Sequence, residues 1–213
     1  MADRDPQGLR RQLEQRLQGT APGGDPFDAW IAGLSPEQTA ALRGHLPGDF
    51  ARAAVMVPLV ERPEGLTVLL TQRASHLKNH PGQISFPGGR IEPHDAGPWE
   101  AALRETREEI GLEPGFASLA GFLHDHMVLT GYLITPAVAF VRPGFALQLD
   151  VTEVDDVFEV PLEFILDPAH HVPHKRAFAG QEFLTHDIPY GDRQIWGATA
   201  GMLLSLYRLL RED

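Results

Sequence analysis

The chain has 213 residues, which is enough for one sizeable domain with a hydrophobic core. Its composition, 43% hydrophobic and 22% charged, excludes a disordered or fibrous protein. The net charge of -11 argues against a protein that binds the nucleic-acid backbone, because such proteins carry a surplus of lysine and arginine. The negative net charge does not exclude an anionic small molecule as ligand, provided that a local basic patch or a metal ion offsets the charge.

The sequence contains no cysteine, so a disulfide framework, a thiolate metal site and a cysteine nucleophile are excluded. The longest apolar runs, 53–60 and 136–141, are far shorter than the roughly 20 residues of a membrane-spanning helix. Residues 1–15 lack the apolar core of a signal peptide. We therefore expect a cytoplasmic protein that neither enters a membrane nor binds nucleic acid.

Residues 1–50 are expected to form a helical extension that precedes a main domain of residues 51–213. The extension begins with a weakly amphipathic segment, 5–18, and a break rich in glycine and proline follows at 19–26.

A second helix is predicted from its start signals. Ser35 is a favourable N-cap, Pro36 occupies the first helical position, and Gln38 completes a capping box. Gly44 is the expected stop.

From residue 52 onward, the pattern becomes typical of strands. Two runs rich in valine and leucine, 52–60 and 66–72, flank a turn and predict a pair of strands. Further strands are expected at 117–124, 132–141, 156–161 and 182–188. Helices are expected at 98–110, ending at Gly111, and at 194–210. This order predicts a mixed sheet covered by helices, an α/β sandwich.

The helix at 98–110 carries three glutamates, Glu105, Glu108 and Glu109, within an arc of roughly 100°. Its apolar positions fall on a separate, core-facing side: Trp99, Leu103, Thr106 and Ile110. Neighbouring like charges destabilise a helix by about 0.2–0.5 kcal/mol per pair. The carboxylate face is therefore either well solvated or built around a bound cation.

The segment before this helix combines positive charge with glycine. Its loop carries four side chains that are or can become cationic: Arg73, His76, Lys78 and His80. Gly88 and Gly89 then permit a close approach of the backbone to a ligand. Together with the carboxylates, this arrangement suits a phosphate-rich ligand held by cations and by metal-bound carboxylates.

Residues 88–112 resemble the Nudix box, a pattern of glycine, glutamate, arginine-glutamate and glutamate-glutamate at fixed spacing. The matching residues are Arg104, Glu105, Glu108, Glu109, Gly111 and Leu112. Thr106 stands in an aliphatic slot, and the spacing from Gly89 to Arg104 is one residue longer than in the general motif. The slot of the early glutamate falls on Asp95 or Ala96, depending on the end from which it is counted.

The upstream residues resemble the coenzyme A pyrophosphatase subgroup of Nudix hydrolases. The matching positions are Leu69, Leu70, Thr71, Arg73, Gly82, Phe86, Pro87, Gly88 and Gly89. Residues 195–203 are also similar to the closing helix of this subgroup, so the resemblance covers roughly residues 52–210.

The resemblance implies a Nudix-type α/β/α sandwich and a pyrophosphohydrolase that depends on Mg²⁺ or Mn²⁺. It implies that Glu105 and Glu109 are the primary metal ligands, with contributions from Glu108 and from the Gly89 carbonyl. Mg²⁺ takes oxygen ligands, bridges phosphates and lowers the pKa of bound water. Arg104 would either orient the carboxylates or form a surface salt bridge.

The resemblance also implies that the substrate is coenzyme A or a derivative, cleaved to 4′-phosphopantetheine and adenosine 3′,5′-bisphosphate. We expect Arg73 and Lys78 to contact substrate phosphates, and Gly88 and Gly89 to approach the substrate closely. One alternative is another nucleoside diphosphate linked to a second group, such as ADP-ribose, NADH or a dinucleotide. The other is a non-catalytic Nudix domain that senses a nucleotide.

The general base stays open between Glu105 and Glu108 within the box and Glu153 and Glu159 beyond it. The number of metal ions, the oligomeric state (with a homodimer as one option) and the role of residues 1–50 are open as well.

Two histidine clusters, 124–126 and 170–174, invite a zinc interpretation. Pro168 and Pro173 break the helix that would place the second cluster on one face. We expect loop roles instead, which for the first cluster include a place near the substrate.

Overall fold

The structure is a computed structural model that describes residues 6–23, 34–46, 49–129 and 131–211. Within these ranges, eight strands form a main sheet and three form a second, smaller sheet. Strand β1 runs parallel to β7, and the other pairings are antiparallel, so the sheet is mixed as expected. The main-sheet strands are β1 (Ala51–Arg62), β2 (Gly65–Arg73), β3 (Ile84–Ser85), β4 (Gly88–Arg90), β5 (Ala117–Phe122), β6 (His126–Val128), β7 (Tyr132–Val141) and β8 (Val154–Pro161).

The central strand β1 separates two hydrophobic cores because its side chains alternate between the faces of the sheet. Val55, Val57 and Leu59 lie in one core. Ala54 and Met56 lie in the other. Strand β1 is therefore buried on both faces, which explains why the sequence at 53–60 is almost uninterrupted in its apolar character.

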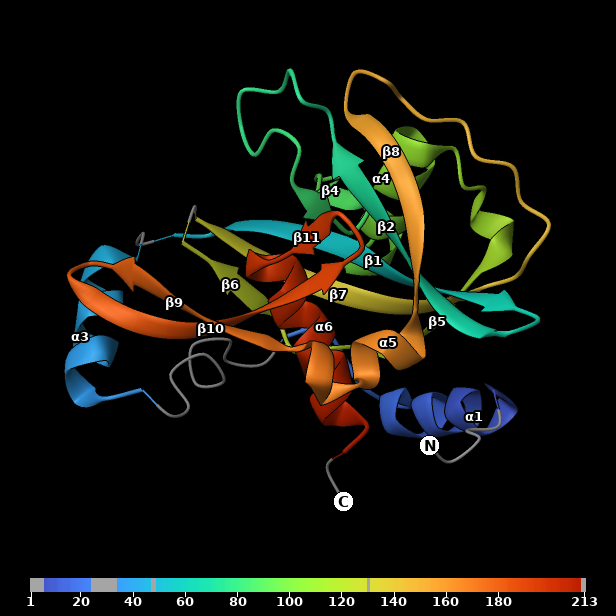
Figure 1. Cartoon of the computed structure of the whole chain (residues 1–213). Coiled ribbons are helices and arrows are strands. Elements are labelled where there is room, and N and C mark those ends of the chain that lie inside the picture. Colours follow the sequence, from blue (N-terminus) through green and yellow to red (C-terminus); the bar gives the residue numbers. More distant parts are fainter. Residues whose placement is uncertain (1–5, 24–33, 47–48, 130, 212–213) are drawn as a thin grey trace.

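Helices cover both faces of this sheet, with α4 on one side and α1, α5 and α6 on the other (Figure 1). The helices are α1 (Pro6–Leu17), α3 (Pro36–His45), α4 (Pro98–Ile110), α5 (Leu162–Leu166) and α6 (Gly197–Leu209), with single 3₁₀ turns at Pro114–Phe116 and Pro168–His170. The α/β sandwich with a mixed sheet and an N-terminal helix is thus confirmed. No helix in the described ranges is long and apolar enough to cross a membrane.

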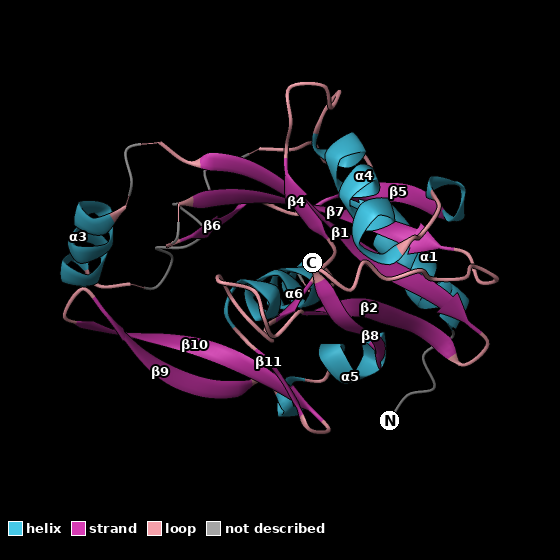
Figure 2. Cartoon of the chain, turned by 90° about the horizontal axis from the view of Figure 1, so that it is seen from above, coloured by secondary structure: helices cyan, strands magenta, loops and turns pink. Residues whose placement is uncertain are grey.

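The smaller sheet contains β9 (Val172–Phe178), β10 (Gln181–Tyr190) and β11 (Arg193–Ile195). Strands β9 and β10 form a long hairpin that extends away from the main sheet toward α3 (Figure 2). The turn of the hairpin places Ala179 and Gly180 in the left-handed region, with φ of 50° and 73°.

The N-terminal helices form as their local signals predict. Helix α1 buries Leu9, Leu13 and Leu17, one apolar stripe, in the core that α6 also covers. At the start of α3, the Ser35 hydroxyl accepts from the Gln38 N–H at 3.2 Å, and the Gln38 side chain accepts from the Ser35 N–H at 2.9 Å. The expected stop at Gly44 is wrong, because the helix continues to His45. The division at residue 51 stays a prediction, and of the break at 19–26 the structure describes residues 19–23, which follow α1 without helix or strand.

The helix at 98–110 is confirmed with its bounds, but the seven-residue strand β9 lies where no strand was predicted. The helix expected at 194–210 begins three residues later, because residues 193–195 pair with β10 as strand β11. The short strands β3, β4 and β6 were not predicted, since two or three residues carry no periodicity.

Candidate active site

Helix α4 packs closely on β1 and β4 through small and aliphatic side chains. Ala101, Ala102 and Ile110 are fully buried there. Gly111 ends the helix in the left-handed conformation, with φ of 70°. The expected apolar face is only partly correct: Trp99 and Leu103 are partly buried against the core, whereas Ala101 and Ala102 are fully buried.

Glu109 lies inside this contact and not on a solvated face. Its side chain accepts a hydrogen bond from the Gly88 N–H at 3.1 Å, and the residue is 6% exposed. Burial raises the pKa of Glu109 to about 8, and the charges of Glu153 and Glu105 contribute to this rise. The expectation of a carboxylate face fully separate from the core is therefore wrong for Glu109.

Glu105 packs against the second glycine. A Cβ atom added to Gly89 would lie 2.5 Å from the carboxyl carbon of Glu105, so the position admits only glycine without a rearrangement. Burial also raises the pKa of Glu105, and Arg104 partly offsets this effect. Glu105 and Glu109 are thus brought together beside the Gly88–Gly89 backbone.

The glycine pair is also required on its other side. Strand β4 pairs with β1 so that Gly88 faces Val55 and Gly89 faces Ala54. Gly88 has φ of 149°, and a Cβ there would lie 2.4 Å from the Ala54 carbonyl oxygen. Two glycines therefore allow strand β4 to fit between β1 and the two carboxylates.

Arg104 connects the acidic side chains that surround it. Its guanidinium donates to both oxygens of Asp95 at 3.0 Å, to Glu105 at 2.9 Å and to Glu108 at 3.0 Å. A fifth hydrogen bond, of 3.0 Å, reaches the Arg90 carbonyl on β4. The bond with Arg104 lowers the pKa of Asp95 to about 2. Asp95 is thus the residue that fixes Arg104, a role that the sequence pattern left unassigned.

Glu108 differs from the other two glutamates of the box. Its side chain is 59% exposed and is held at the site by a hydrogen bond from Arg104. Among the residues that the structure describes, no three histidine, aspartate or glutamate side chains already surround one point as a metal cage would. The site is therefore a pair of neighbouring carboxylates with a third at its rim.

Arg73 stands at the end of β2, near these carboxylates. Its charge lowers the pKa of Glu109, and its buried Nε has no hydrogen-bond partner in the described structure. Arg73 also closes the base of the loop at 74–83, because its N–H donates to Gln83 and its carbonyl accepts from Gly82. Lys78 is exposed in this loop and forms no hydrogen bond or ion pair with the described residues.

Of the two distal acids, only Glu153 approaches the site. The chain after β7 returns to the end of α4, where the Gln148 and Asp150 N–H groups donate to helix carbonyls at 2.9 Å. This return places Glu153 next to the loop at 74–83, since its carbonyl accepts from the Ala74 N–H at 2.8 Å. The charge of Glu153 contributes to the raised pKa values of both Glu105 and Glu109.

Glu159 belongs to a separate structural network. It accepts hydrogen bonds from Arg62 and from Thr67, on strands β1 and β2. Although burial opposes the shift, these bonds lower the pKa of Glu159.

Three histidines of the two clusters pack against neighbouring residues, and the expected loop roles are wrong for His126 and His174, which lie on strands β6 and β9. The His126 ring lies against Gly201 of α6, and burial lowers its pKa to about 4. His170 stacks on Phe164, with ring centroids 3.6 Å apart, and His171 bonds to the Ile165 carbonyl at 2.7 Å.

Comparisons with known proteins identify the family. The NUDIX domain model matches residues 50–180. Two curated relatives bear the name uncharacterized Nudix hydrolase NudL. The protein of Shigella flexneri serotype 5b is 37% identical over 164 residues, covering 75% of this chain and 83% of the relative. That of Escherichia coli K12 is 38% identical over 159 residues, covering 73% and 80%.

Among solved structures, this chain is similar to an Ap4A hydrolase of C. elegans. The two share 21% sequence identity and a TM-score of 0.45, and the match covers 52% of this chain and 80% of that chain.

The family model and the curated relatives show that this chain belongs to the Nudix family, and the acidic site lies between its α4 and β4. The protein is a Nudix hydrolase, hence an enzyme, which disfavours the non-catalytic alternative. Nudix hydrolases generally use divalent metal ions such as Mg²⁺ or Mn²⁺.

Proposed function

We propose that this enzyme is a pyrophosphohydrolase that depends on a divalent metal ion and cleaves coenzyme A or its derivatives. The products would be 4′-phosphopantetheine, or its acyl form, and adenosine 3′,5′-bisphosphate. The observation that carries the hydrolase assignment is the meeting of Glu105 and Glu109 beside the Gly88–Gly89 backbone, with Glu153 near them. The choice of coenzyme A rests on the upstream motif and on the basic residues that precede the site.

The donor set fits a hard divalent cation. Glu105 and Glu109 are partly or fully buried carboxylates whose pKa values are raised by burial and by neighbouring carboxylates, and a bound cation would favour their charged forms. We propose Mg²⁺ or Mn²⁺, with Glu105 and Glu109 as primary ligands, Glu108 assisting, and the Gly89 carbonyl as a further ligand. The ion would neutralise phosphate charge and lower the pKa of a bound water.

The chain's own residues would prepare the site for this chemistry. Arg104, held by Asp95, directs the carboxylates of Glu105 and Glu108, which is the work of a positioning residue. Glu105, Glu108 and Glu153 are the candidates for accepting the proton of the attacking water. Glu159 is no longer among them, because Arg62 and Thr67 already occupy its carboxylate.

Substrate phosphates would be held on the side of the basic loop, which is residues 74–83 with Arg73 at its base. The buried, unpartnered Nε of Arg73 supports a contact with a phosphate oxygen, and Lys78 is free to reach one from the exposed loop. Gly88 and Gly89 let the backbone approach the diphosphate. Coenzyme A carries a 3′-phosphate that ADP-ribose lacks, so a cation near this group would favour coenzyme A.

A hydrolysis screen tests the proposal. Coenzyme A, 3′-dephospho-coenzyme A, ADP-ribose, NADH and diadenosine polyphosphates are each incubated with Mg²⁺ and with Mn²⁺. We expect the highest kcat/KM for coenzyme A, and a preferential loss of this activity if Arg73→Ala or Lys78→Ala removes the contact to the 3′-phosphate. Loss of one charge-assisted bond should cost about 10- to 150-fold in kcat/KM.

A higher kcat/KM for ADP-ribose or a dinucleotide would instead favour the alternative class of substrate.

We also propose that the protein is cytoplasmic, that it forms a homodimer, and that residues 1–50 extend a hydrolase domain at 51–213.

A further inference from the structure

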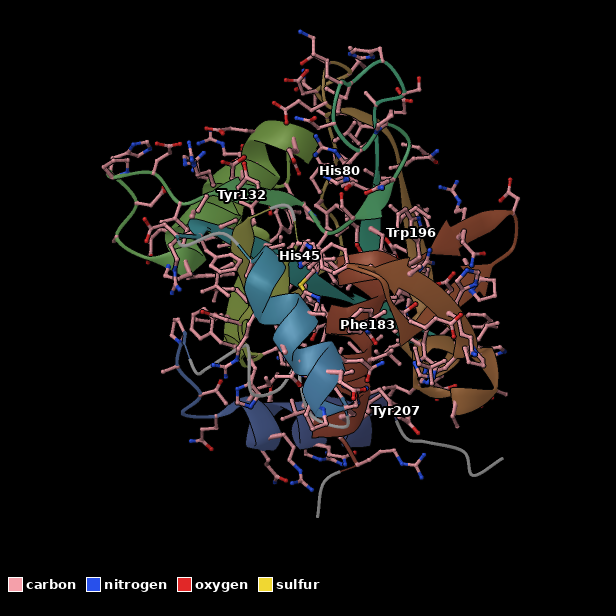
Figure 3. All side chains as sticks on the ribbon, turned by 90° about the vertical axis from the view of Figure 1, so that its left-hand side faces the viewer. His45, His80, Tyr132, Phe183, Trp196 and Tyr207 are labelled. Atoms are coloured by element: carbon pink, nitrogen blue, oxygen red, sulfur yellow. The ribbon has the colours of Figure 1, made fainter. Side chains whose placement is uncertain are left out.

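Trp196 is a large aromatic side chain that the fold holds at the surface. It is 37% exposed and lies at the junction between β11 and α6. Figure 3 labels it together with His80 of the loop at 74–83 and Phe183 of the hairpin. A tryptophan that served only to fill the core would be expected to bury more of its ring, because the ring is mostly apolar.

The Trp196 ring lies against Arg176, which belongs to a polar network around the buried Asp187. The guanidinium carbon of Arg176 lies 4.8 Å from its centroid, within the range of a cation–π contact. Arg176 in turn donates to both oxygens of Asp187, at 2.8 Å and 2.9 Å, and the Gln194 amide donates to Asp187 at 3.1 Å. Asp187 is 4% exposed and holds Arg176, whose own side chain is 35% exposed, beside the ring. The exposed part of the ring is left for another molecule.

Trp196 is also connected to the catalytic region. Three residues beyond it, the Thr199 hydroxyl donates to the Ile84 carbonyl at 2.9 Å. Ile84 follows the basic loop directly and precedes Gly88 by four residues, a span of about 14 Å at most. The start of α6, which follows Trp196, is thus bonded to the short strand between the loop at 74–83 and the glycine pair.

We propose that Trp196 is a stacking platform for the adenine base of the substrate. This inference rests on the proposed function and deepens it by naming the residue that recognises the base. The base is the only aromatic group in coenzyme A, so it is the part of the substrate that an exposed indole would select. Stacking of a base on an aromatic side chain contributes about 1–3 kcal/mol.

Steady-state kinetics separate stacking from simple packing. Trp196→Leu keeps an apolar side chain but cannot stack, whereas Trp196→Phe keeps an aromatic ring. We expect Trp196→Leu to raise the KM for coenzyme A by about 5- to 150-fold, the equivalent of 1–3 kcal/mol, with little change in kcat. Trp196→Phe should restore most of the affinity. Equal KM values for the two variants would overturn the proposal.

The matched control is Leu184→Ala, which changes another exposed apolar side chain on strand β10 of the hairpin. Leu184 is 64% exposed and lies outside the network of Arg176 and Asp187. This variant should leave the KM for coenzyme A unchanged. A rise equal to that of Trp196→Leu would show that the hairpin surface in general, and not the indole, affects binding, and would also overturn the proposal.

A binding experiment gives a readout that does not need turnover. Tryptophan fluorescence is followed while adenosine 3′,5′-bisphosphate or 4′-phosphopantetheine is added to the wild type and to Trp196→Phe. We expect quenching of the wild type by the adenine nucleotide alone, and its loss in Trp196→Phe. Equal quenching in both proteins would contradict stacking on Trp196, even if Trp196→Leu proved too unstable for kinetics.

The two proposals can fail separately. If the wild type does not hydrolyse coenzyme A but an adenine nucleotide still quenches Trp196, the proposed substrate falls and the platform stands. If coenzyme A is hydrolysed efficiently while Trp196→Leu and Trp196→Phe share the wild-type KM, the function stands and the platform falls.

Discussion

The acidic site beside α4 and the network around Glu159 both join an arginine to carboxylates, but they differ in charge balance. Around Glu159, one arginine and one threonine satisfy one carboxylate, and the pKa of that carboxyl is lowered. Beside α4, the bonds of Arg104 reach three carboxylates while Glu109 and Glu153 add further negative charge, and the pKa values of Glu105 and Glu109 are raised.

This difference separates a structural ion pair from a candidate binding site. A balanced pair needs nothing further from its surroundings, whereas a surplus of buried negative charge lowers stability unless a cation binds. The fold accepts this cost at the contact between α4 and β4, where the paired glycines let the strand fit closely against β1 and Glu105. The following changes test that interpretation, from the largest expected effect to the smallest.

Removal of one charge from the acidic pair should have the largest effect on catalysis. Glu105→Gln keeps the size of the side chain but removes a proposed metal ligand, so kcat should fall by orders of magnitude at saturating Mg²⁺. The matched control is Glu100→Gln, an exposed glutamate on the same helix, which should retain activity. Near-wild-type kcat in Glu105→Gln would remove Glu105 from the site.

Weakening the hydrogen bonds that position Arg104 should have an intermediate effect on catalysis. Asp95→Asn would weaken the bidentate bond that fixes Arg104. Because the change acts through the position of Glu105, we expect kcat/KM to fall by about 10- to 100-fold. The apparent affinity for Mg²⁺, measured from the dependence of rate on metal concentration, should fall as well. An unchanged metal dependence would show that Arg104 does not position a ligand.

The surplus of negative charge beside α4 also predicts how the stability of the metal-free protein depends on pH. Glu109 has a folded-state pKa of about 8, above the ordinary value of 4.5, so its ionisation favours unfolding. The wild type should be free of this penalty below pH 4.5 and should lose stability progressively as the pH rises from there to about 8. Glu109→Gln should lack this loss and be more stable near pH 8 by a few kcal/mol, because a difference of one in pKa corresponds to about 1.4 kcal/mol.

Chemical denaturation at pH 5 and pH 8, in the presence of a chelator, measures this difference. If the wild type and Glu109→Gln have the same free energy of unfolding at pH 8, the carboxyl of Glu109 is not strained by its surroundings.

The balanced pair should show the opposite behaviour and the smallest effect on activity. Glu159→Gln removes charge-assisted bonds to Arg62 and Thr67, so the free energy of unfolding should decrease by about 1–2 kcal/mol. Turnover per folded molecule should not change. A large fall in kcat, with the fold intact, would return Glu159 to the list of candidate bases.

Local sequence patterns predicted the parts of the site that lie on one element. The spacing of Glu105, Glu108 and Glu109 defines a helix face, and Gly88–Gly89 marks a close backbone approach. The burial of Glu109 was not predictable in this way, because it depends on strand β4 fitting between β1 and the helix. Two or three residues of strand give no periodic signal, so this contact becomes visible only in the folded chain.

The same limit applies to the residues that support the site. Asp95 lies in a loop nine residues before Arg104, and nothing in its local sequence indicates a bidentate bond. Glu153 could be distinguished from Glu159 only by the return of the chain to the end of α4. In contrast, the capping box of Ser35 and Gln38 is wholly local, and it formed as predicted.

Binding of Mn²⁺ to the protein without substrate tests the central claim most directly. Electron paramagnetic resonance counts free Mn²⁺ as it is added to the wild type, to the double variant Glu105→Gln/Glu109→Gln, and to Glu159→Gln. If the surplus carboxylates form a cation site, the wild type and Glu159→Gln should bind Mn²⁺ with equal affinity, and the double variant should lose this binding. Equal binding by the double variant and the wild type would contradict the account, since the two buried glutamates would then have no part in holding the metal.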